Sequence, residues 1–217
     1  MIRIIDLYDL SHTLAGEYLK GFEMPWQALQ GISELIISLG KKLGGDFNEI
    51  SEGVWVHKSA DVAATAYIGA PTIIGADTEV RHCAFIRGGA LIGQGCVVGN
   101  STELKNVILF DGVQVPHFNY VGDSILGYKA HMGAGSITSN VKSDKSEITV
   151  RANRQYSTGL TKVGAMLGDF AEIGCNSVLN PGTVICRGAS VYPLSSVRGV
   201  VAQNCIYKGN GVIVPKA

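Results

Sequence analysis

The chain has 217 residues, and its 18 Lys and Arg are balanced by 18 Asp and Glu, so the formal net charge at pH 7 is zero. Because there is no run of Lys and Arg, binding to nucleic acid is not expected. No stretch approaches 18 uninterrupted apolar residues and the N-terminus lacks the layout of a signal peptide, so the sequence predicts neither a membrane-spanning segment nor secretion.

Residues 1–50 carry a helical pattern. Asp9 or Ser11 is a candidate cap for a short helix that runs to about Lys20, and Pro25 suits a first helical turn. Apolar residues then follow at helical spacing until two glycines end the run: Trp26, Leu29, Ile32, Leu35, Ile36 and Leu39, then Gly44 and Gly45. We expect this amphipathic segment to be a helical cap on the first coil of the repeat that follows.

A six-residue repeat dominates the rest of the chain. An aliphatic or aromatic residue recurs at every sixth position through Val56, Val62, Ile68, Ile74, Val80, Ile86, Ile92, Val98, Leu104 and Phe110, then at Leu126 and Met132, then from Leu167 to Val197. Four positions after most of them stands a small residue, as at Ala60, Ala66, Thr72, Thr78, Ala84, Ala90, Cys96 and Thr102. Such hexapeptides are the signature of a β-helix.

A period of six does not fit an α-helix, but it equals three strand periods. Each hexapeptide therefore forms a short strand and a corner, with one large and one small side chain inside a narrow interior. Three hexapeptides make a coil of 18 residues, and coils stack about 4.8 Å apart through parallel pairing. We predict an all-β parallel β-helix over residues 51–200.

The repeat is interrupted twice. It loses two residues between Phe110 and Leu126, so a corner tightens or a segment protrudes there. Residues 141–162 break it outright with a polar, charged insertion too long for a corner, and long loops in regular scaffolds are usually functional. We expect a tail over residues 201–217.

The five cysteines are scattered and contain no Cys-x-x-Cys pair: Cys83, Cys96, Cys175, Cys186 and Cys205. This usage predicts reduced thiols and a cytoplasmic location. Cys96 occupies a small inward position of its hexapeptide, so we interpret it as part of the core.

The irregular centre carries the residues with chemical potential. His117 stands beside an irregular turn in Pro-His-Phe-Asn-Tyr-Val-Gly-Asp, and residues 133–140 follow as Gly-Ala-Gly-Ser-Ile-Thr-Ser-Asn. A histidine in such a place acts as a general base near neutral pH, or is simply a surface residue. Arg87 and Lys105 lie 18 residues, one full coil, apart, so we expect them to stack on adjacent coils, either as two solvated charges or as a pair that can bind a phosphate.

These motifs resemble the acetyltransferase domain of the bifunctional N-acetylglucosamine-1-phosphate uridyltransferase/glucosamine-1-phosphate acetyltransferase, and related sugar-1-phosphate nucleotidyltransferases with β-helix tails. The resemblance implies a left-handed β-helix. It also implies that Arg87 and Lys105 bind the substrate phosphate, that His117 is the catalytic base, that Tyr120 contacts the sugar and that Asn140 is an active-site asparagine. The intervals between these residues, 18, 12, 3 and 20, keep the family's register.

Three features depart from the family. His131 stands where the family has a sugar-contacting asparagine, and Val141 where it has a tyrosine. The loop lysine falls on Ser146, with Lys145 adjacent, so His131 and Lys145 become the candidate substrate contacts. No glycine-rich nucleotide loop precedes the coil, so uridylyl transfer is not expected.

The resemblance implies acetyl-CoA-dependent N-acetylation of an amino sugar 1-phosphate by a homotrimer, with His117 oriented by Asp123. Acetyl-CoA would lie near Ala134 and Cys175. No metal is required, because His117 and His131 lack a third ligand at suitable spacing. Two alternatives stay open. One is acetylation of a different small acceptor, and the other is a non-catalytic β-helix that binds a sugar nucleotide or partners a separate nucleotidyltransferase.

Overall fold

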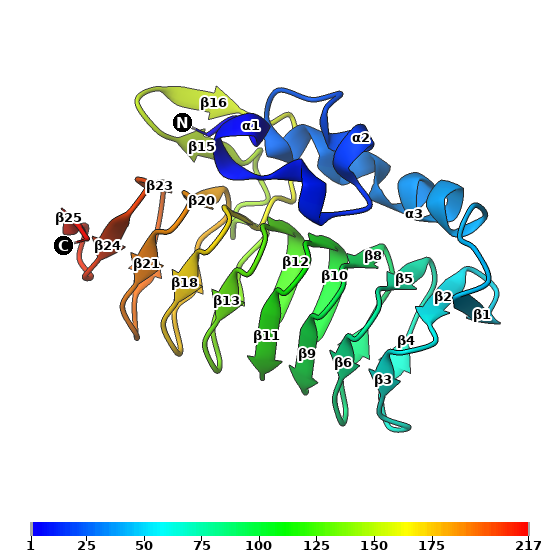
Figure 1. Cartoon of the computed structure of the whole chain (residues 1–217). Coiled ribbons are helices and arrows are strands. Elements are labelled where there is room, and N and C mark those ends of the chain that lie inside the picture. The colour runs from blue at the N-terminus through cyan, green and yellow to red at the C-terminus, as the bar shows by residue number, and fades with distance from the viewer. Residues whose placement is uncertain (1, 217) are drawn as a thin grey trace.

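A computed structural model describes residues 2–216 as a parallel β-solenoid of about nine turns preceded by short helices (Figure 1). Its strands form three faces. The first face contains β2 (Val54–His57), β5 (Thr72–Ile74), β8 (Ala90–Ile92), the second halves of β10 (Glu103–Leu109) and β12 (Tyr120–Leu126), β17 (Ala165–Leu167), β20 (Thr183–Ile185) and β23 (Val200–Val201).

The other two faces consist mostly of two-residue strands. The second face contains β3 (Asp61–Val62), β6 (Glu79–Val80), β9 (Val97–Asn100), β11 (Gln114–His117), β13 (His131–Met132), β18 (Glu172–Ile173), β21 (Ser190–Val191) and β24 (Cys205–Tyr207). The third face contains β4 (Tyr67–Ile68), β7 (Phe85–Ile86), the first halves of β10 and β12, β14 (Ile137–Thr138), β19 (Val178–Leu179) and β22 (Ser196–Val197). The predicted parallel β-helix is confirmed.

The pairing register confirms the 18-residue coil at the start of the solenoid. Val54 pairs with Thr72, and Thr72 pairs with Ala90. The repeat residues Ile74 and Ile92 are fully buried, and so is the small residue Thr72. Cys96 is also buried, and its burial raises the pKa of its thiol to about 12. The large and small residues of the repeat therefore form the interior.

The outward side chains differ between the faces. On the first face they are apolar and still buried, as at Ile73, Leu91 and Ile108. On the third face Tyr67 and Phe85 are 60% and 42% exposed, respectively. Because an apolar outer column needs a cover, the first face is where the N-terminal segment packs.

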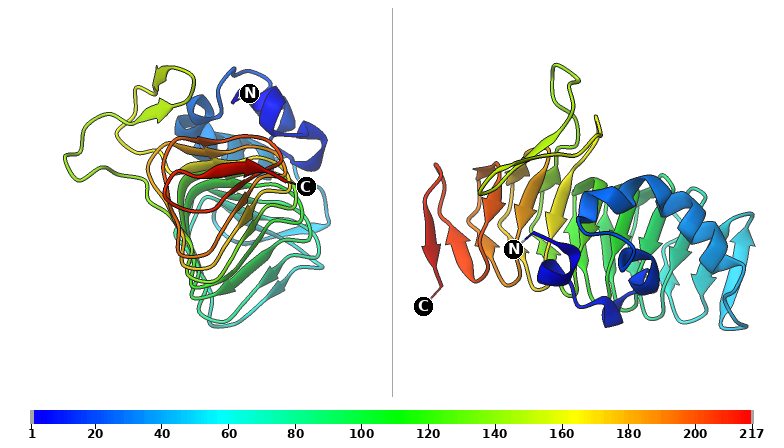
Figure 2. Two further views of the ribbon diagram at one scale, coloured as in Figure 1. Left: turned by 90° about the vertical axis from the view of Figure 1, so that its left-hand side faces the viewer. Right: turned by 90° about the horizontal axis from the view of Figure 1, so that it is seen from above.

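The N-terminal segment lies along the side of the solenoid (Figures 1 and 2). It contains α1 (Ile4–Leu7), η1 (Leu10–His12), α2 (Gly16–Leu19), η2 (Pro25–Gly31) and α3 (Ile32–Gly40). Asp9 caps η1 by accepting from the backbone N–H of Ser11, and Pro25 opens η2 as expected. Helix α3 contacts β5, β8 and β10, so the segment covers several coils rather than the end of the first one.

Antiparallel strands cover the two ends of the solenoid instead. Strand β1 (Phe47–Ser51) pairs with β2, and β25 (Ile213–Pro215) pairs with β24. Parallel pairing continues to Tyr207, so the coil extends beyond the expected boundary at residue 200. Within residues 2–216, no helix has the length and apolar character needed to cross a membrane.

The two residues missing from the repeat are lost at two stacked corners, and the first of these precedes Phe110. Ile92 pairs with Leu109, so Leu109 holds the repeat position that the sequence pattern assigned to Phe110. Phe85 pairs with Glu103, 18 residues on, whereas Ala90 pairs with Val107, only 17 residues on. The next coil keeps this shorter spacing, with Val107 opposite Ser124. The two coils that contain β10 and β12 therefore each have one residue fewer at the corner between the third and first faces. Asn106 and Asp123 occupy these corners, with φ values of 54° and 48°.

The 141–162 insertion leaves the solenoid at this same edge and folds back over the first face. It forms a hairpin of β15 (Thr149–Arg151) and β16 (Gln155–Ser157). Ile148 and Val150 are fully buried, and the ring of Tyr156 lies 6.1 Å from that of Trp26 in η2. The hairpin is therefore packed on its own chain, beside the N-terminal segment (Figure 2).

Candidate functional site

Arg87 and Lys105 stack on adjacent coils, as their spacing predicts. The backbone N–H of Arg87 donates to the carbonyl of Leu104 at 2.9 Å, which continues the β7–β10 ladder. The Arg87 guanidinium pairs with Glu103, with Nη1 2.8 Å from Oε1, and this contact raises the pKa of Arg87. The two cations share one face, but each already has a carboxylate partner.

Asp123 is the partner of Lys105 and the centre of the cluster. Its side chain is 6% exposed and lies 3.4 Å from Nζ of Lys105. Oδ1 accepts from Nδ2 of Asn106 at 2.9 Å, and Oδ2 accepts from Nδ2 of Asn140 at 2.5 Å. The two short corners create this arrangement, because they stack Asn106 directly beside Asp123. His117 is not among the partners of Asp123, so the expected orienting contact between them is absent.

Tyr120 and Asn140 complete the cluster. Nδ2 of Asn140 donates to Oη of Tyr120 at 3.2 Å as well as to Asp123. Burial raises the pKa of the Tyr120 phenol, and the nearby carboxylates of Asp123 and Glu103 add to the shift. Tyr120 therefore stays protonated at neutral pH. Both amide hydrogens of Asn140 are used within the cluster, so only its Oδ1 remains for a ligand.

His117 lies at the other edge of the third face, at the end of β11. Three residues of β12, 120–122, separate the two edges, which corresponds to about 10 Å of extended chain. The side chain of His117 is exposed and makes no hydrogen bond to any of residues 2–216. A proton acceptor is thus available at this edge, without a second group of the same chain to orient it.

Asn119 fixes the backbone at His117, and the sequence did not point to it. Its Oδ1 accepts from the backbone N–H of His117 at 3.1 Å. Its Nδ2 donates to the carbonyls of Gly133 and Ser136 on the next coil at 2.9 and 3.0 Å. Asn119 is 2% exposed and occupies a small inward position, one 17-residue coil after Thr102. The sequence could have indicated Asn119, because a polar side chain at an inward position is unusual. The shortened coil hid this, since it places Asn119 17 and not 18 residues after Thr102.

The other predicted site residues lie apart from the cluster. Ala134 and Cys175 occupy the same edge as His117 on neighbouring coils, where the N–H of Asn176 donates to the Ala134 carbonyl at 2.8 Å. His131 lies on the second face and pairs with Glu172, with Nδ1 2.9 Å from Oε2. Lys145 is exposed in the insertion. One chain therefore brings together Arg87, Lys105, Tyr120 and Asn140, and leaves His117, Ala134, Cys175, His131 and Lys145 outside that group.

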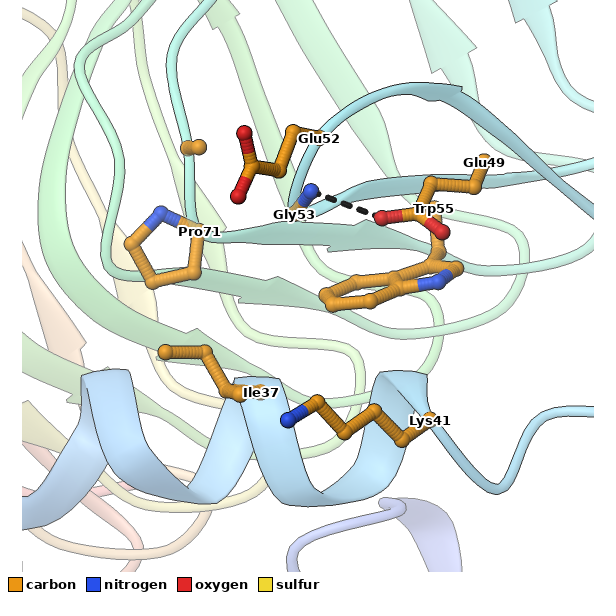
Figure 3. A pocket seen from close by; sticks show the side chains of 8 residues that line it. Ile37, Lys41, Glu49, Glu52, Gly53, Trp55 and Pro71 are labelled. Carbon is orange, nitrogen blue, oxygen red and sulfur yellow. Dashed lines mark hydrogen bonds between the residues drawn. The ribbon is translucent and has the colours of Figure 1, made fainter.

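A cavity of about 600 Å³ lies elsewhere, between α3 and the first coils (Figure 3). Ile37 of α3 and Lys41, which directly follows α3, face Trp55 and Pro71 across it, and Glu52 also lines it. None of the residues singled out from the sequence lines it. We therefore place the candidate site on the third face.

Comparison with known proteins supports a relationship over half of the chain. No family model matches. The chain is 32% identical over 109 residues to the bifunctional sugar-1-phosphate nucleotidylyltransferase/acetyltransferase of Sulfurisphaera tokodaii. This stretch covers 50% of this chain and 27% of that protein. The chain is 29% identical over 118 residues to the bifunctional protein GlmU of Methanococcus maripaludis, which is 54% of this chain and 29% of that one. The matched half is a hexapeptide-repeat region related to these acetyltransferases.

The matched stretch spans less than a third of either relative's length. Among solved structures, the acetyltransferase domain of PglB from Neisseria gonorrhoeae in complex with acetyl coenzyme A covers 75% of this chain. The match covers 57% of that domain, with 13% sequence identity and a TM-score of 0.34. At that score the likeness carries no argument about the chemistry of this chain.

Proposed function

We propose that this protein transfers the acetyl group of acetyl-CoA to the amine of an amino sugar 1-phosphate of the glucosamine 1-phosphate kind. The observation that carries the proposal is the stacking of Arg87 and Lys105 beside Tyr120, Asp123 and Asn140 on one face. The Sulfurisphaera tokodaii relative is named as both a sugar-1-phosphate nucleotidylyltransferase and an acetyltransferase, which supports acetyl transfer and a sugar phosphate as the acceptor class. Acetyl-CoA is the co-substrate.

The reaction moves one proton from the acceptor amine to the sulfur of CoA, and His117 carries it between the two atoms. The acceptor amine attacks the thioester carbonyl, and His117 takes the proton that the nitrogen loses. The tetrahedral intermediate then collapses, the carbon–sulfur bond breaks, and the thiolate of CoA leaves and takes up a proton. The oxyanion needs a fixed donor. Because both amide hydrogens of Asn140 are used, and the N–H groups of Gly133, Gly135 and Ser136 donate to carbonyls, we assign that donor to the backbone N–H of Ala134.

The acceptor phosphate would be an additional partner of the two cations, which Glu103 and Asp123 hold in place. Lys105 is the better anchor, because it is 28% exposed and held by Asp123 at 3.4 Å, whereas Arg87 is more exposed, at 45%. A charge-assisted contact to phosphate is worth about 1.5–3 kcal/mol. Lys105→Ala should therefore weaken glucosamine 1-phosphate binding roughly tenfold to a hundredfold or slightly more, and leave glucosamine unaffected.

Calorimetric titration of both ligands into the parent and the variant checks this prediction. Lys58→Ala is the matched control, because Lys58 is an exposed lysine on an early coil, away from the cluster. If the parent shows no phosphate-dependent affinity at millimolar ligand, the two cations do not form a phosphate site.

We further propose a homotrimer, in which a neighbouring subunit covers the third face and supplies what His117 lacks. Large exposed side chains on and beside that face, Tyr67, Phe85 and Phe118, support this arrangement. Sedimentation equilibrium should give about three times the chain mass of 22.9 kDa at micromolar concentration. A monomer under those conditions contradicts the assembly.

A second candidate function is non-catalytic binding of a sugar nucleotide. The unpartnered side chain of His117 favours it, since a general base is usually held by a second group. A turnover screen separates the two, with acetyl-CoA as donor, free thiol as the readout, and amino sugars with and without a 1-phosphate as acceptors. Phosphate-dependent thiol release supports the transferase. Binding of the sugar phosphates without any thiol release, in the trimeric protein, supports the binding protein.

A further inference from the structure

A second positively charged site lies beside the candidate acceptor site, on the C-terminal side of Asn140. A pocket of about 430 Å³ opens between the start of the insertion and the edge where the third face meets the first. Its lining is almost entirely polar: Ser139, Lys142, Asp144, Arg151, Asn180 and Arg198.

Three separate parts of the chain bring the basic side chains to this pocket. Arg198 follows β22, and its guanidinium donates to Oδ1 of Asn180 on the adjacent coil at 3.1 Å. Arg151 comes from β15, whose backbone lies so close to the corner at Gly199 that an added Cβ there would meet the Arg151 carbonyl at 3.0 Å. Lys142 comes from the first residues of the insertion. The hairpin is thus fixed against the coil that carries Arg198.

Positive side chains outnumber carboxylates in the pocket, although the ammonium of Lys142 already donates to the hydroxyl of Ser146 and the carbonyl of Glu147. Lys142, Arg151 and Arg198 line it with only one carboxylate, Asp144, although the whole chain is neutral. Within residues 2–216, neither Arg151 nor Arg198 pairs with a carboxylate. The other five arginines all have a partner: Arg3, Arg81, Arg87 and Arg187 pair with Asp6, Glu79, Glu103 and Asp169, and Arg154 lies over the ring of Tyr156.

Two guanidinium groups that have no carboxylate partner among the described residues, in a concave polar site, are what recognition of an oxyanion needs. Each presents N–H donors in a planar fork that matches a phosphate, and each is charged at every physiological pH. Asn180 and Ser139 add neutral polar groups to the same wall. We propose that this pocket binds a phosphate group, separately from the one expected at Arg87 and Lys105.

This inference does not depend on acetyl transfer, because the pocket contains none of the residues assigned to that reaction. The phosphate can belong to the nucleotide part of CoA or to a second phosphate on the acceptor. Both sources present the same tetrahedral anion to the pocket, so the variants below are first tested with a simple probe and then with each source.

The first experiment titrates pyrophosphate into the full chain by calorimetry at low ionic strength. Arg151→Gln and Arg198→Gln should each weaken its binding at least about tenfold, because each removes a charge-assisted contact. Arg154→Gln is the matched control from the same hairpin, outside the pocket, and should change the affinity less than about twofold. Far-ultraviolet circular dichroism confirms that each variant is folded.

A variant of the acceptor cluster distinguishes the two phosphate sites. Lys105→Gln should leave binding at the pocket unchanged, whereas Arg198→Gln should leave phosphate-dependent acceptor binding at Lys105 unchanged. If pyrophosphate affinity falls only in Lys105→Gln, or stays at the parent value in both arginine variants, the pocket proposal is overturned.

The second experiment identifies the source. If Arg198→Gln weakens binding of CoA but not of 3′-dephospho-CoA, the pocket binds the 3′-phosphate of the donor. If it weakens glucosamine 1,6-bisphosphate but not glucosamine 1-phosphate, the pocket binds a second phosphate of the acceptor. If only pyrophosphate responds, the pocket is a site for a free phosphate ligand, and the proposal still holds.

Discussion

Replacing His117 with alanine should lower kcat for acetyl transfer at least about 100-fold and leave CoA binding unchanged. A positioned general base typically raises the reaction rate about 10²–10⁴-fold. His117 is suited to this role because it lies beside Ala134, at an edge of the third face. Steady-state kinetics with the best acceptor of the screen, together with calorimetry of CoA, measures both quantities.

The chain offers a matched control for this variant. His82 lies at the same edge two coils earlier, because Asn100 pairs with His117 and donates its Nδ2 to the His82 carbonyl at 3.1 Å. His82→Ala should keep the parent kcat, since the hydrogen bond that its ring makes within residues 2–216 is to the hydroxyl of Thr65, far from the cluster. Equal turnover in both variants removes His117 from the mechanism, and loss of the folded state in His117→Ala alone assigns it a structural role.

The repeat allowed the architecture to be predicted because each inward position is occupied by a residue of the right size. Ile74, Ile92 and Thr72 are buried where the six-residue period places them. The break of the repeat over residues 141–162 falls on the segment that contains the β15–β16 hairpin. The period of apolar residues indicates which side chains are buried. It therefore predicts structure correctly at positions where the need for burial determines the residue type.

Periodicity was less informative about the positions of the short corners and the helices. The period shortens by one residue at Asn106 and again at Asp123. The sequence pattern placed both losses between Phe110 and Leu126, because the apolar Phe110 stands one position after the actual repeat residue, Leu109. The amphipathic pattern of α3 shows that one side is buried, but not whether it packs on the end or on the side of the solenoid. The outward apolar column of Ile73 and Leu91 held that information.

The candidate site was only partly predictable for a related reason. Arg87 and Lys105 follow from the 18-residue spacing, because stacking in a solenoid depends on coil length alone. Their carboxylate partners depend on side-chain directions at shortened corners, which no spacing rule gives. Asp123 was therefore assigned to His117, whereas the structure places it with Lys105 and Asn140.

Asp123→Ala should be the most destabilising single change in the site, lowering the free energy of unfolding by about 3 kcal/mol. It removes the acceptor of the Asn106 and Asn140 amides, and an unsatisfied buried donor costs about 1–3 kcal/mol. It also removes the partner of Lys105, although water compensates part of this loss because Lys105 is 28% exposed. The acceptor affinity should fall with it, since Asn140 and Lys105 both lose their anchor.

The loss of stability in Asp123→Ala has two contributions, the lost side-chain contacts and the unfavourable placing of alanine at a φ of 48°. Asp77→Ala measures the backbone contribution alone, since Asp77 is an exposed corner residue with a φ of 55°. Urea unfolding followed by circular dichroism should show a loss of about 1–2 kcal/mol for Asp77→Ala, the cost of the left-handed conformation alone. If Asp123→Ala costs no more than Asp77→Ala, the carboxylate does not hold the cluster together, and Asn140 and Lys105 must be positioned by the coil itself.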